Sequence, residues 1–462
     1  MQLVVGTVVV LGMPSTPELT NQTVELLQSM IRNECVNEGT EDSGHEVRNA
    51  DLLQTVIEGT GLDVERYEAA PGRVSVVARI EGTDPTAPSL CLNGHTDVVP
   101  VNVEGWDRDP FAGELIDGEV WGRGAIDMLS LTAAMAVTFR HLATTNFRPK
   151  GDLIFFGVAD EESGSKYGAQ WMADNHADAI RSDYVLTENG GLHGGAENAP
   201  TVSMSVGEKG VAWRRLRVRG TPGHGSRPYG SDNALIKAAA IVQGVADYKT
   251  PPRFHERWRK QIDDLAQKFS FDEDLVAKLL DPGSVDEAIA SMPLAMGSHL
   301  HSCCHTTMSP NVAVSPTKTN TIPDVVDIDI DVRTMPGETP EDVHRYLTEA
   351  FGDLAKEVEI SPLMNDMAST SPIDTPLWDS LQKAVHNAFP STELSPGLIV
   401  GFTDARVHRN LGAVAYGAGL LSPDLDASEY GSRFHGNNER IDVESIGLTT
   451  GLYLDTVTDL LS

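Results

Sequence analysis

The stretch "LIFFGVADEESGS" (153–165) decides the fold, because an apolar strand in it ends directly in three carboxylates. Residues 153–159 are apolar or small, which is typical of a strand that belongs to a core. Asp160, Glu161 and Glu162 follow, and a Ser/Gly turn comes next. Concentrated negative charge at the end of a core strand indicates that this end of the strand belongs to a binding or catalytic site.

Similar apolar runs alternate with helical patterns on both sides of this stretch. Strand-like segments lie at 72–82, 87–97, 151–162 and 182–191, and helical patterns lie at 18–33, 48–61, 127–144 and 167–180. Alternation of this kind predicts an α/β fold with a mostly parallel sheet and helices on both faces.

The middle of the chain has a different pattern. Segments 210–220 and 323–337 alternate strictly between apolar and charged residues, which predicts a sheet covered on one face only. Each is followed by a helical pattern, so we expect a smaller α+β domain over 209–366, inserted into a larger domain formed by 1–208 and 367–462. The charged helical stretch 253–290 resembles an insertion within the smaller domain.

The composition excludes several classes of function. The chain has 462 residues, 67 of them acidic and 35 basic, and its formal charge of −32 repels nucleic acids and anionic membranes but attracts metal cations. Four irregularly spaced cysteines predict reduced thiols. No run is long enough to span a membrane, and the opening "MQLVVGTVVVLGMP" lacks the basic start of a signal peptide, so we expect a cytoplasmic protein.

Polar residues recur where the predicted strands end. They are, in chain order, His95 and Asp97, Asp127, Asp160 to Glu162, and Glu188, while His435 stands before a terminal helix. Taken singly, each has an ordinary explanation: a hydrogen-bonded turn pair, a solvated acidic loop, or a helix cap at Asp127. Ligands of open α/β sheets bind beyond the carboxyl ends of the strands, so we expect these side chains to meet there.

So many carboxylates at one edge would raise each other's pKa unless cations neutralised them. Imidazole and carboxylate without thiolate suit Zn²⁺, with Co²⁺ or Mn²⁺ as substitutes, and we expect two ions. Asp97 lies two residues from His95 and can orient its ring, and one of Glu161 and Glu162 can bind metal while the other acts as general base. Asp127 is the carboxylate best placed to bridge two metals.

The chain resembles the M20 metallopeptidases, the group of aminoacylases, carboxypeptidases and succinyl-diaminopimelate desuccinylases. The resemblance runs from about residue 70 to the end, and nine motifs occur in the family's order. They are "NGHTDVVP" (93–100), "WDRDPFAGELIDGEVWGRGAIDM" (106–128), "DEESGS" (160–165), "TENGG" (187–191), "GTPGHGSRPYGSDNA" (220–234), "TNTIPD" (319–324), "DVRTMPG" (331–337), "GFTDAR" (401–406) and "HGNNERID" (435–442).

The resemblance implies a role for each site residue. His95, Asp127 and Glu188 would hold one metal and Asp127, Glu162 and His435 the other. Glu161 would be the general base, and Asp97 would orient a ligand. It also implies that the inserted domain is a lid and a homodimer interface, from which His224 stabilises the oxyanion while Asn320 and Arg333 contact the carboxylate end of the substrate.

The segment "HLHSCCHTT" (299–307) contains five potential zinc ligands outside these motifs. It falls where the family has a lid strand, and we interpret it as structural.

We therefore expect a dinuclear metal hydrolase that cleaves an amide bond in a small N-acyl amino acid or a short peptide with a free carboxylate. An aminopeptidase on the same metal site is the alternative within the enzymes. A catalytically silent binding protein on this fold is the alternative of another class.

Overall fold

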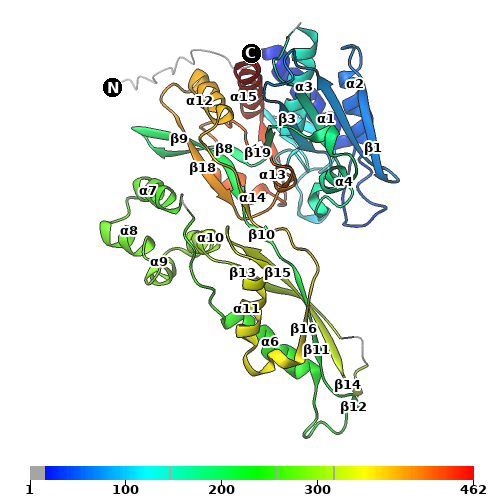
Figure 1. Cartoon of the computed structure of the whole chain (residues 1–462), viewed down its shortest axis with the longest axis vertical. Helices are drawn as coiled ribbons and strands as arrows, with labels where there is room; N and C mark the ends of the chain where they lie inside the picture. Colours follow the sequence, from blue (N-terminus) through cyan, green and yellow to red (C-terminus); the bar gives the residue numbers. More distant parts are fainter. Residues whose placement is uncertain (1–15, 146, 256, 316–317) are drawn as a thin grey trace. The chain divides into compact units, whose positions relative to one another are not determined.

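The computed structural model describes residues 16–145, 147–255, 257–315 and 318–462 (Figure 1). The chain divides into two compact units. Unit 1 comprises the residues up to Val206, Ser371–Gly397 and Thr403–Ser462, and unit 2 comprises Gly207–Thr370 and Leu398–Phe402. The boundaries expected from the sequence, 208/209 and 366/367, lie close to these. The stretch 1–14, interpreted above for targeting, lies outside the described residues.

Unit 1 is built on a large sheet whose central strands are parallel. Its order is β1 (Val64–Ala70), β2 (Arg73–Ile80), β6 (Leu153–Val158), β3 (Leu90–His95), β7 (Tyr184–Thr187), β19 (Val414–Gly417) and β9 (Ala199–Glu208), and β8 (Gly190–Ala196) and β18 (Glu393–Ile399) also pair with β9. Strands β6, β3, β7 and β19 run parallel, and the outer pairs are antiparallel. The predicted α/β fold with a parallel sheet core is confirmed.

Helices cover both faces of this sheet, because side chains alternate along its strands. Val76 and Ala78 of β2 join the core beneath one set of helices, whereas Val77 joins the core beneath the other. The first set is α1 (Pro17–Arg32), α2 (Val47–Ile57), α3 (Leu129–Thr144), α12 (Pro376–Ala388) and α15 (Val443–Leu461); the second is α4 (Ala169–Asn175), α5 (Ala177–Ile180) and α13 (Ala405–Asn410). Both faces are therefore buried, and only the strand ends can present polar groups.

Local sequence signals account for several helix starts. Thr16, Thr375 and Asp442 each accept a hydrogen bond from a backbone N–H in the first turn of α1, α12 and α15, and Pro follows both threonines. Helix α3 is different, because its N-cap is Met128, which makes no side-chain capping bond. The alternative that Asp127 caps this helix is therefore wrong.

Unit 2 contains an antiparallel sheet with one apolar and one charged face. Its strands are β10 (Gly210–Val211), β15 (Val325–Thr334), β11 (Arg214–Arg219) and β16 (Val358–Pro362), and β13 (Thr307–Val314) also pairs with β15. Leu216, Ile328 and Ile330 pack with helices α6 (Ala234–Asp247) and α11 (Pro340–Phe351). The opposite face carries arginine–aspartate pairs.

Four further helices of unit 2 have a small core of their own. They are α7 (Trp258–Phe269), α8 (Glu273–Leu279), α9 (Val285–Ala290) and α10 (Leu294–Cys304). The predicted helical stretch 253–290 therefore continues through α10. The expectation of a lid strand at 299–307 is wrong for 299–304, because Leu300, Cys303 and Cys304 are spaced for one helix face and are buried in this core. Strand β13 begins only at Thr307.

Within the residues that the structure describes, no helix combines the length and the apolar character needed to cross a membrane.

Candidate metal centre

Three parallel strands bring histidine and carboxylate side chains to the same edge of the unit 1 sheet. Strand β3 ends at His95, Glu161 and Glu162 form a short 3-10 turn after β6, and Glu188 directly follows β7. Because β6, β3 and β7 are parallel neighbours, their carboxyl ends meet. His95, Glu161 and Glu188 each offer a ligand atom, and these atoms lie within 4.8 Å of one another.

Asp127 lies between two histidines. Its Oδ1 is 3.2 Å from Nε2 of His95, and its Oδ2 is 3.3 Å from Nε2 of His435. His435 Nε2 is also 3.2 Å from Oε2 of Glu162. The two oxygens of one carboxylate thus face two separate groups of donors, and this is the arrangement that a bridging ligand requires.

Asp127 does not come from the large sheet, in contrast to the expectation that all the ligands follow its strands. Strand β5 (Glu119–Trp121), which precedes it, belongs to a separate three-stranded sheet with β4 (Glu114–Ile116) and β20 (Arg440–Asp442). The turn after β5 is held by Glu439, a residue that the sequence interpretation missed.

The Glu439 carboxylate is fully buried and accepts hydrogen bonds from the backbone N–H groups of Gly124, Ile126 and Asp127 at 2.7–3.1 Å. It also pairs with Arg123 at 2.8 Å. Glu439 therefore fixes the backbone that presents Asp127. Glu439 could have been proposed from the sequence, because it lies in the same short motif as His435, "HGNNERID" (435–442).

Asp97 supports the turn that carries Glu161 and Glu162. Its Oδ1 accepts the N–H of Glu161 and its Oδ2 accepts the N–H of Glu162, both at 3.2 Å, and Asn37 Nδ2 donates to Oδ2 at 2.8 Å. The backbone carbonyl of Asp97 lies 2.9 Å from Nδ1 of His95, closer than its carboxylate at 3.6 Å. A proton on Nδ1 leaves Nε2 of His95 free to act as a ligand.

A buried ion network fixes the residue before the two glutamates. Asp160 has a left-handed backbone, with φ of 64°, and its Oδ1 accepts hydrogen bonds from Arg73 at 2.6 Å and from Asn37 at 2.9 Å. Arg73 also binds Glu46 through two nitrogens. Asn37, Glu46 and Arg73 were also missed, because nothing in their local sequence marks them as partners of a distant acidic turn.

Burial sets the protonation of the three glutamates. It raises the pKa of Glu161 well above its ordinary value, and the charges of Asp404 and Glu162 add to this effect. Burial, together with the charges of Asp127 and Glu161, does the same to the pKa of Glu188. Burial and the charge of Asp127 raise the pKa of Glu162 to about 7.

The two histidines are shifted by the carboxylates around them. Burial alone would lower the pKa of His95, but the hydrogen bond with Asp127 and the charge of Glu188 raise it well above its ordinary value. Hydrogen bonds with Asp127 and Glu162 raise the pKa of His435 to about 10. Burial opposes ionisation of Asp127, but the hydrogen bonds with both histidines bring its pKa below its usual range.

The donor set fits divalent metal ions. Oε1 of Glu161 and Oε1 of Glu162 are buried, and neither has a hydrogen-bond partner among the described residues. Buried carboxylate oxygens without partners are costly, and a cation would satisfy them. Imidazole nitrogens with carboxylate oxygens are ligands that Zn²⁺, Co²⁺ and Mn²⁺ accept.

The remaining predicted site residues belong to unit 2. His224 lies on β12 (Gly223–His224), which pairs with β14 (Thr321–Ile322), and Asn320 immediately precedes β14. Nδ1 of His224 lies 2.7 Å from Oγ of Ser226, and the His224 side chain is exposed. Arg333 lies on β15, forms an ion pair with Asp331 at 2.8 Å and stacks on the ring of Phe402. His224 and Asn320 therefore lie together at the two-stranded sheet of β12 and β14, whereas Arg333 lies on the five-stranded sheet of unit 2.

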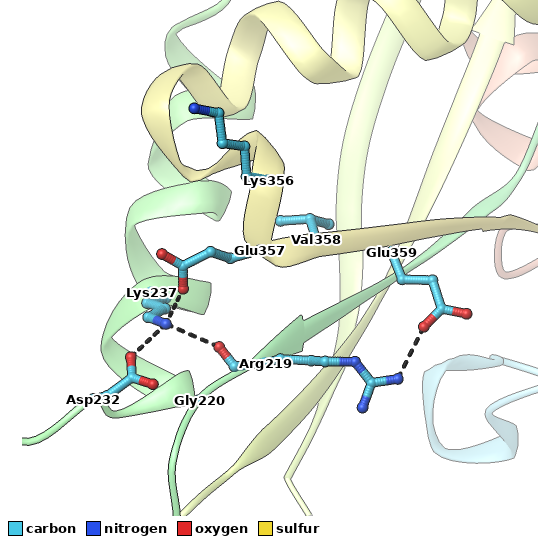
Figure 2. A pocket seen from close by; sticks show the side chains of 8 residues that line it. All are labelled: Arg219, Gly220, Asp232, Lys237, Lys356, Glu357, Val358 and Glu359. Atoms are coloured by element: carbon cyan, nitrogen blue, oxygen red, sulfur yellow. Dashed lines mark hydrogen bonds and ion pairs between the residues drawn. The ribbon is translucent and has the colours of Figure 1, made fainter.

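Unit 2 also has a surface pocket of about 350 Å³ (Figure 2). Five of its six charged groups pair with each other, since Lys237 binds Asp232 and Glu357 and Arg219 binds Glu359 at 3.0 Å; the sixth is Lys356. Since these five charges already have partners, the pocket does not compete with the metal donors as the functional site.

Histidine and carboxylate donors beyond the ends of parallel strands define a hydrolase of the metallopeptidase class. The model of peptidase family M20/M25/M40 matches residues 91–459, so the chain belongs to this family. The resemblance stated from the sequence motifs is confirmed.

Individual relatives and structures agree with the family. The chain is 27% identical over 395 residues to the N-fatty-acyl-amino acid synthase/hydrolase PM20D1 of Xenopus tropicalis, covering 84% of this chain and 75% of that protein. It shares its fold with an M20 family metallo-carboxypeptidase from Sulfolobus solfataricus, with a TM-score of 0.70, 17% identity and coverage of 96% and 99% of the two chains. A dinuclear metal binding M20 peptidase of Bacillus subtilis gives a TM-score of 0.60 at 12% identity, with coverage of 96% and 99%.

Proposed function

We propose that this hydrolase uses two divalent metal ions to cleave the amide bond of an N-acyl amino acid or a short peptide with a free carboxylate. The observation that carries the proposal is Asp127, whose two oxygens lie 3.2 Å and 3.3 Å from the Nε2 atoms of His95 and His435. Two histidines on opposite oxygens of one carboxylate suit two ions better than one.

The proposed ligand sets leave Glu161 free and use the other five donors of the site. His95, Asp127 and Glu188 would hold one ion, and Asp127, Glu162 and His435 the other. When bound, such ions act as Lewis acids that polarise the scissile carbonyl and make water more acidic. Zinc is the proposed metal, with cobalt or manganese as substitutes.

Glu161 is the proposed general base. Its Oε1 is buried and makes no hydrogen bond in the described part of the chain, so this oxygen is available to accept a proton. In the reaction, Glu161 accepts a proton from the attacking water and then donates it to the nitrogen of the leaving amine. Asp97 keeps Glu161 in place through the hydrogen bond to its backbone N–H.

Unit 2 is proposed to complete the substrate site. His224 would stabilise the negative charge on the carbonyl oxygen, and Asn320 and Arg333 would contact the carboxylate end of the substrate. We also propose that the protein forms a homodimer through this unit and functions in the cytoplasm.

The substrate class is supported by the relative from Xenopus tropicalis, whose name describes the synthesis and hydrolysis of N-fatty-acyl amino acids. The test is a panel of N-acetyl, N-fatty-acyl and N-succinyl amino acids and dipeptides, assayed with Zn²⁺, Co²⁺ or Mn²⁺ added to the chelator-treated protein. We expect metal-dependent release of the free amino acid from at least one N-acyl substrate. Activity that requires a free amine and is retained when the carboxylate of the peptide is amidated would contradict the proposal and favour an aminopeptidase.

A further inference from the structure

A second group of metal donors lies in the helical part of unit 2, outside the M20 motifs. Asp286 on α9, His301 on α10 and His305 immediately after α10 each offer one ligand atom, and these atoms lie within 4.8 Å of one another. Helices α9 and α10 are neighbours in the α7–α10 group (Figure 1).

His305 is oriented as a metal ligand would be. Its side chain is only 1% exposed, and its Nδ1 lies 2.8 Å from the backbone carbonyl of Thr250. Donation from Nδ1 to that carbonyl leaves the lone pair on Nε2, which lies 3.0 Å from Oδ1 of Asp286. Nε2 of His305 and Oδ1 of Asp286 are buried and face each other at this distance, and neither makes a hydrogen bond in the described part of the chain, although the Asp286 side chain as a whole is 44% exposed.

His301 supplies the second imidazole from the turn before. Its ring lies parallel to that of His305, with centroids 4.3 Å apart and an angle of 5° between the planes, so one of the two rings must rotate for both to bind the same ion. The N–H of His305 donates to the carbonyl of His301 at 2.9 Å, so the helical spacing continues to His305. Two histidines four residues apart on a helical turn are a recurrent zinc-binding arrangement.

The nearby lysine does not occupy this position. Lys209 is buried, and its Nζ donates to the backbone carbonyls of Ser302 and His305 at 3.0 Å and 2.7 Å. Its charge therefore interacts with the carbonyl end of α10, where a cation is favoured. Lys209 therefore makes no hydrogen bond to Nε2 of His305 or to Oδ1 of Asp286.

We propose that Asp286, His301 and His305 bind one Zn²⁺ ion, which fastens α9 to the end of α10. Two imidazoles and one carboxylate supply three protein ligands, and water can complete a tetrahedral zinc site. Asp286 lies on α9 and His301 on α10, so the ion would join these two helices. His305 lies between α10 and β13, so the ion would also fix the start of β13. This proposal concerns unit 2 alone and does not depend on the proposed function.

The experiment counts zinc ions in the full-length protein. Chelator-treated protein is loaded with Zn²⁺, freed of loose metal, and analysed by native mass spectrometry, with Asp286→Asn and His301→Ala as the variants. We expect each variant to hold one ion fewer per chain than the unsubstituted protein. His299→Ala is the matched control, because His299 lies on the same helix but contacts Cys303 rather than the triad, and it should keep the full count.

Hydrogen exchange gives a second readout that does not rely on counting ions. Adding Zn²⁺ to chelator-treated protein should slow exchange in peptides from α9 and the end of α10, and Asp286→Asn should remove this protection. An equal zinc count in all proteins, or exchange in α9 that zinc leaves unchanged, would overturn the proposal. If unit 1 bound no metal, the unsubstituted protein should hold one ion per chain and the Asp286→Asn and His301→Ala variants none. The zinc site of unit 2 can therefore be tested even if the proposed site of unit 1 fails.

Discussion

The carboxylates of unit 1 and those of the unit 2 sheet are balanced in different ways. On the charged face of unit 2, Asp329 and Asp327 each receive two hydrogen bonds from an arginine, Arg215 and Arg217, at 2.7–2.8 Å. At the edge of the unit 1 sheet, Glu161 and Glu162 are buried, and each keeps an oxygen without a hydrogen-bond partner in the described structure.

The carboxylates of the unit 2 sheet are neutralised by arginines of the protein itself. The glutamates of unit 1 keep oxygens that a bound cation could neutralise. The aspartates of unit 2 are partly exposed and paired, so their cost is small whatever is bound. Buried carboxylate oxygens without partners are expensive even where, as in Glu162, the other oxygen pairs with a histidine, and they persist where a metal or a reaction requires them.

The largest effect is expected from Glu161→Gln. This change keeps the shape of the side chain but removes the base, so turnover should fall by about 10²–10⁴-fold while both metals are retained. Steady-state kinetics and metal analysis of the same sample test this. Exposed Glu104→Gln should leave both unchanged, and near-normal turnover of Glu161→Gln would assign the base elsewhere.

Removal of Glu439 should be the most damaging change to stability. Glu439→Ala leaves Arg123 buried without its partner and frees three backbone N–H groups, so we expect a loss of about 3–5 kcal/mol in the free energy of unfolding. Denaturant unfolding measures this loss. Glu359→Ala, which breaks the ion pair with Arg219 between side chains that are 62% and 63% exposed, should cost below ~1 kcal/mol. Equal losses would show that Glu439 does not hold the Asp127 turn.

Asp97→Asn should weaken metal binding without removing a ligand. The amide can accept only through its oxygen, so one of the N–H groups of Glu161 and Glu162 loses its partner. Changes of this kind typically reduce metal affinity by about 10–100-fold, and competition with a chelating dye measures it. Unchanged affinity would mean that the turn keeps its shape without Asp97.

The stability of the metal-free protein should fall as pH rises. The pKa of Glu162 is raised from 4.5 to about 7, so its contribution is complete below 4.5 and lost as pH passes about 7. The pKa of His435 is raised from 6.5 to about 10, so its contribution is complete below 6.5 and lost through about 10. Metal ions favour ionised glutamate and neutral histidine, so zinc should remove this decline. Melting curves with and without chelator test it, and a metal-free protein that gains stability over this interval would contradict it.

The smallest effect is expected on the charged face of unit 2. Arg217→Ala removes an ion pair whose arginine is 45% exposed, so the free energy of unfolding should hardly change. A double-mutant cycle with Asp327→Ala isolates the pair. A coupling of several kcal/mol would remove the contrast between the two regions.

The sequence could predict the residues that follow strands of the parallel sheet. His95, Glu161, Glu162 and Glu188 were accessible because parallel strands carry their carboxyl ends to one edge, whatever the chain does elsewhere. His435 was grouped with them although it precedes a helix, whereas His224, Asn320 and Arg333 were proposed only through the family motifs; the roles of all these residues remain proposals.

Hydrogen bonds between residues far apart in the chain could not be predicted from the sequence. Asp127 is placed by Glu439, which lies 312 residues away, and Asp160 is placed by Arg73, 87 residues away. Neither distance leaves a periodic pattern in the sequence. The helical state of 299–304 was missed for another reason. The five histidine and cysteine residues of 299–305 were considered as possible zinc ligands, and the helical spacing of Leu300, Cys303 and Cys304 was therefore overlooked.

Anomalous diffraction at the zinc edge, on crystals of the zinc-loaded protein, tests the account most directly. We expect two peaks at the unit 1 sheet edge, one beside each carboxylate oxygen of Asp127. A well-ordered Asp127 with no anomalous peak next to it would contradict the claim that this carboxylate cluster exists to hold metal.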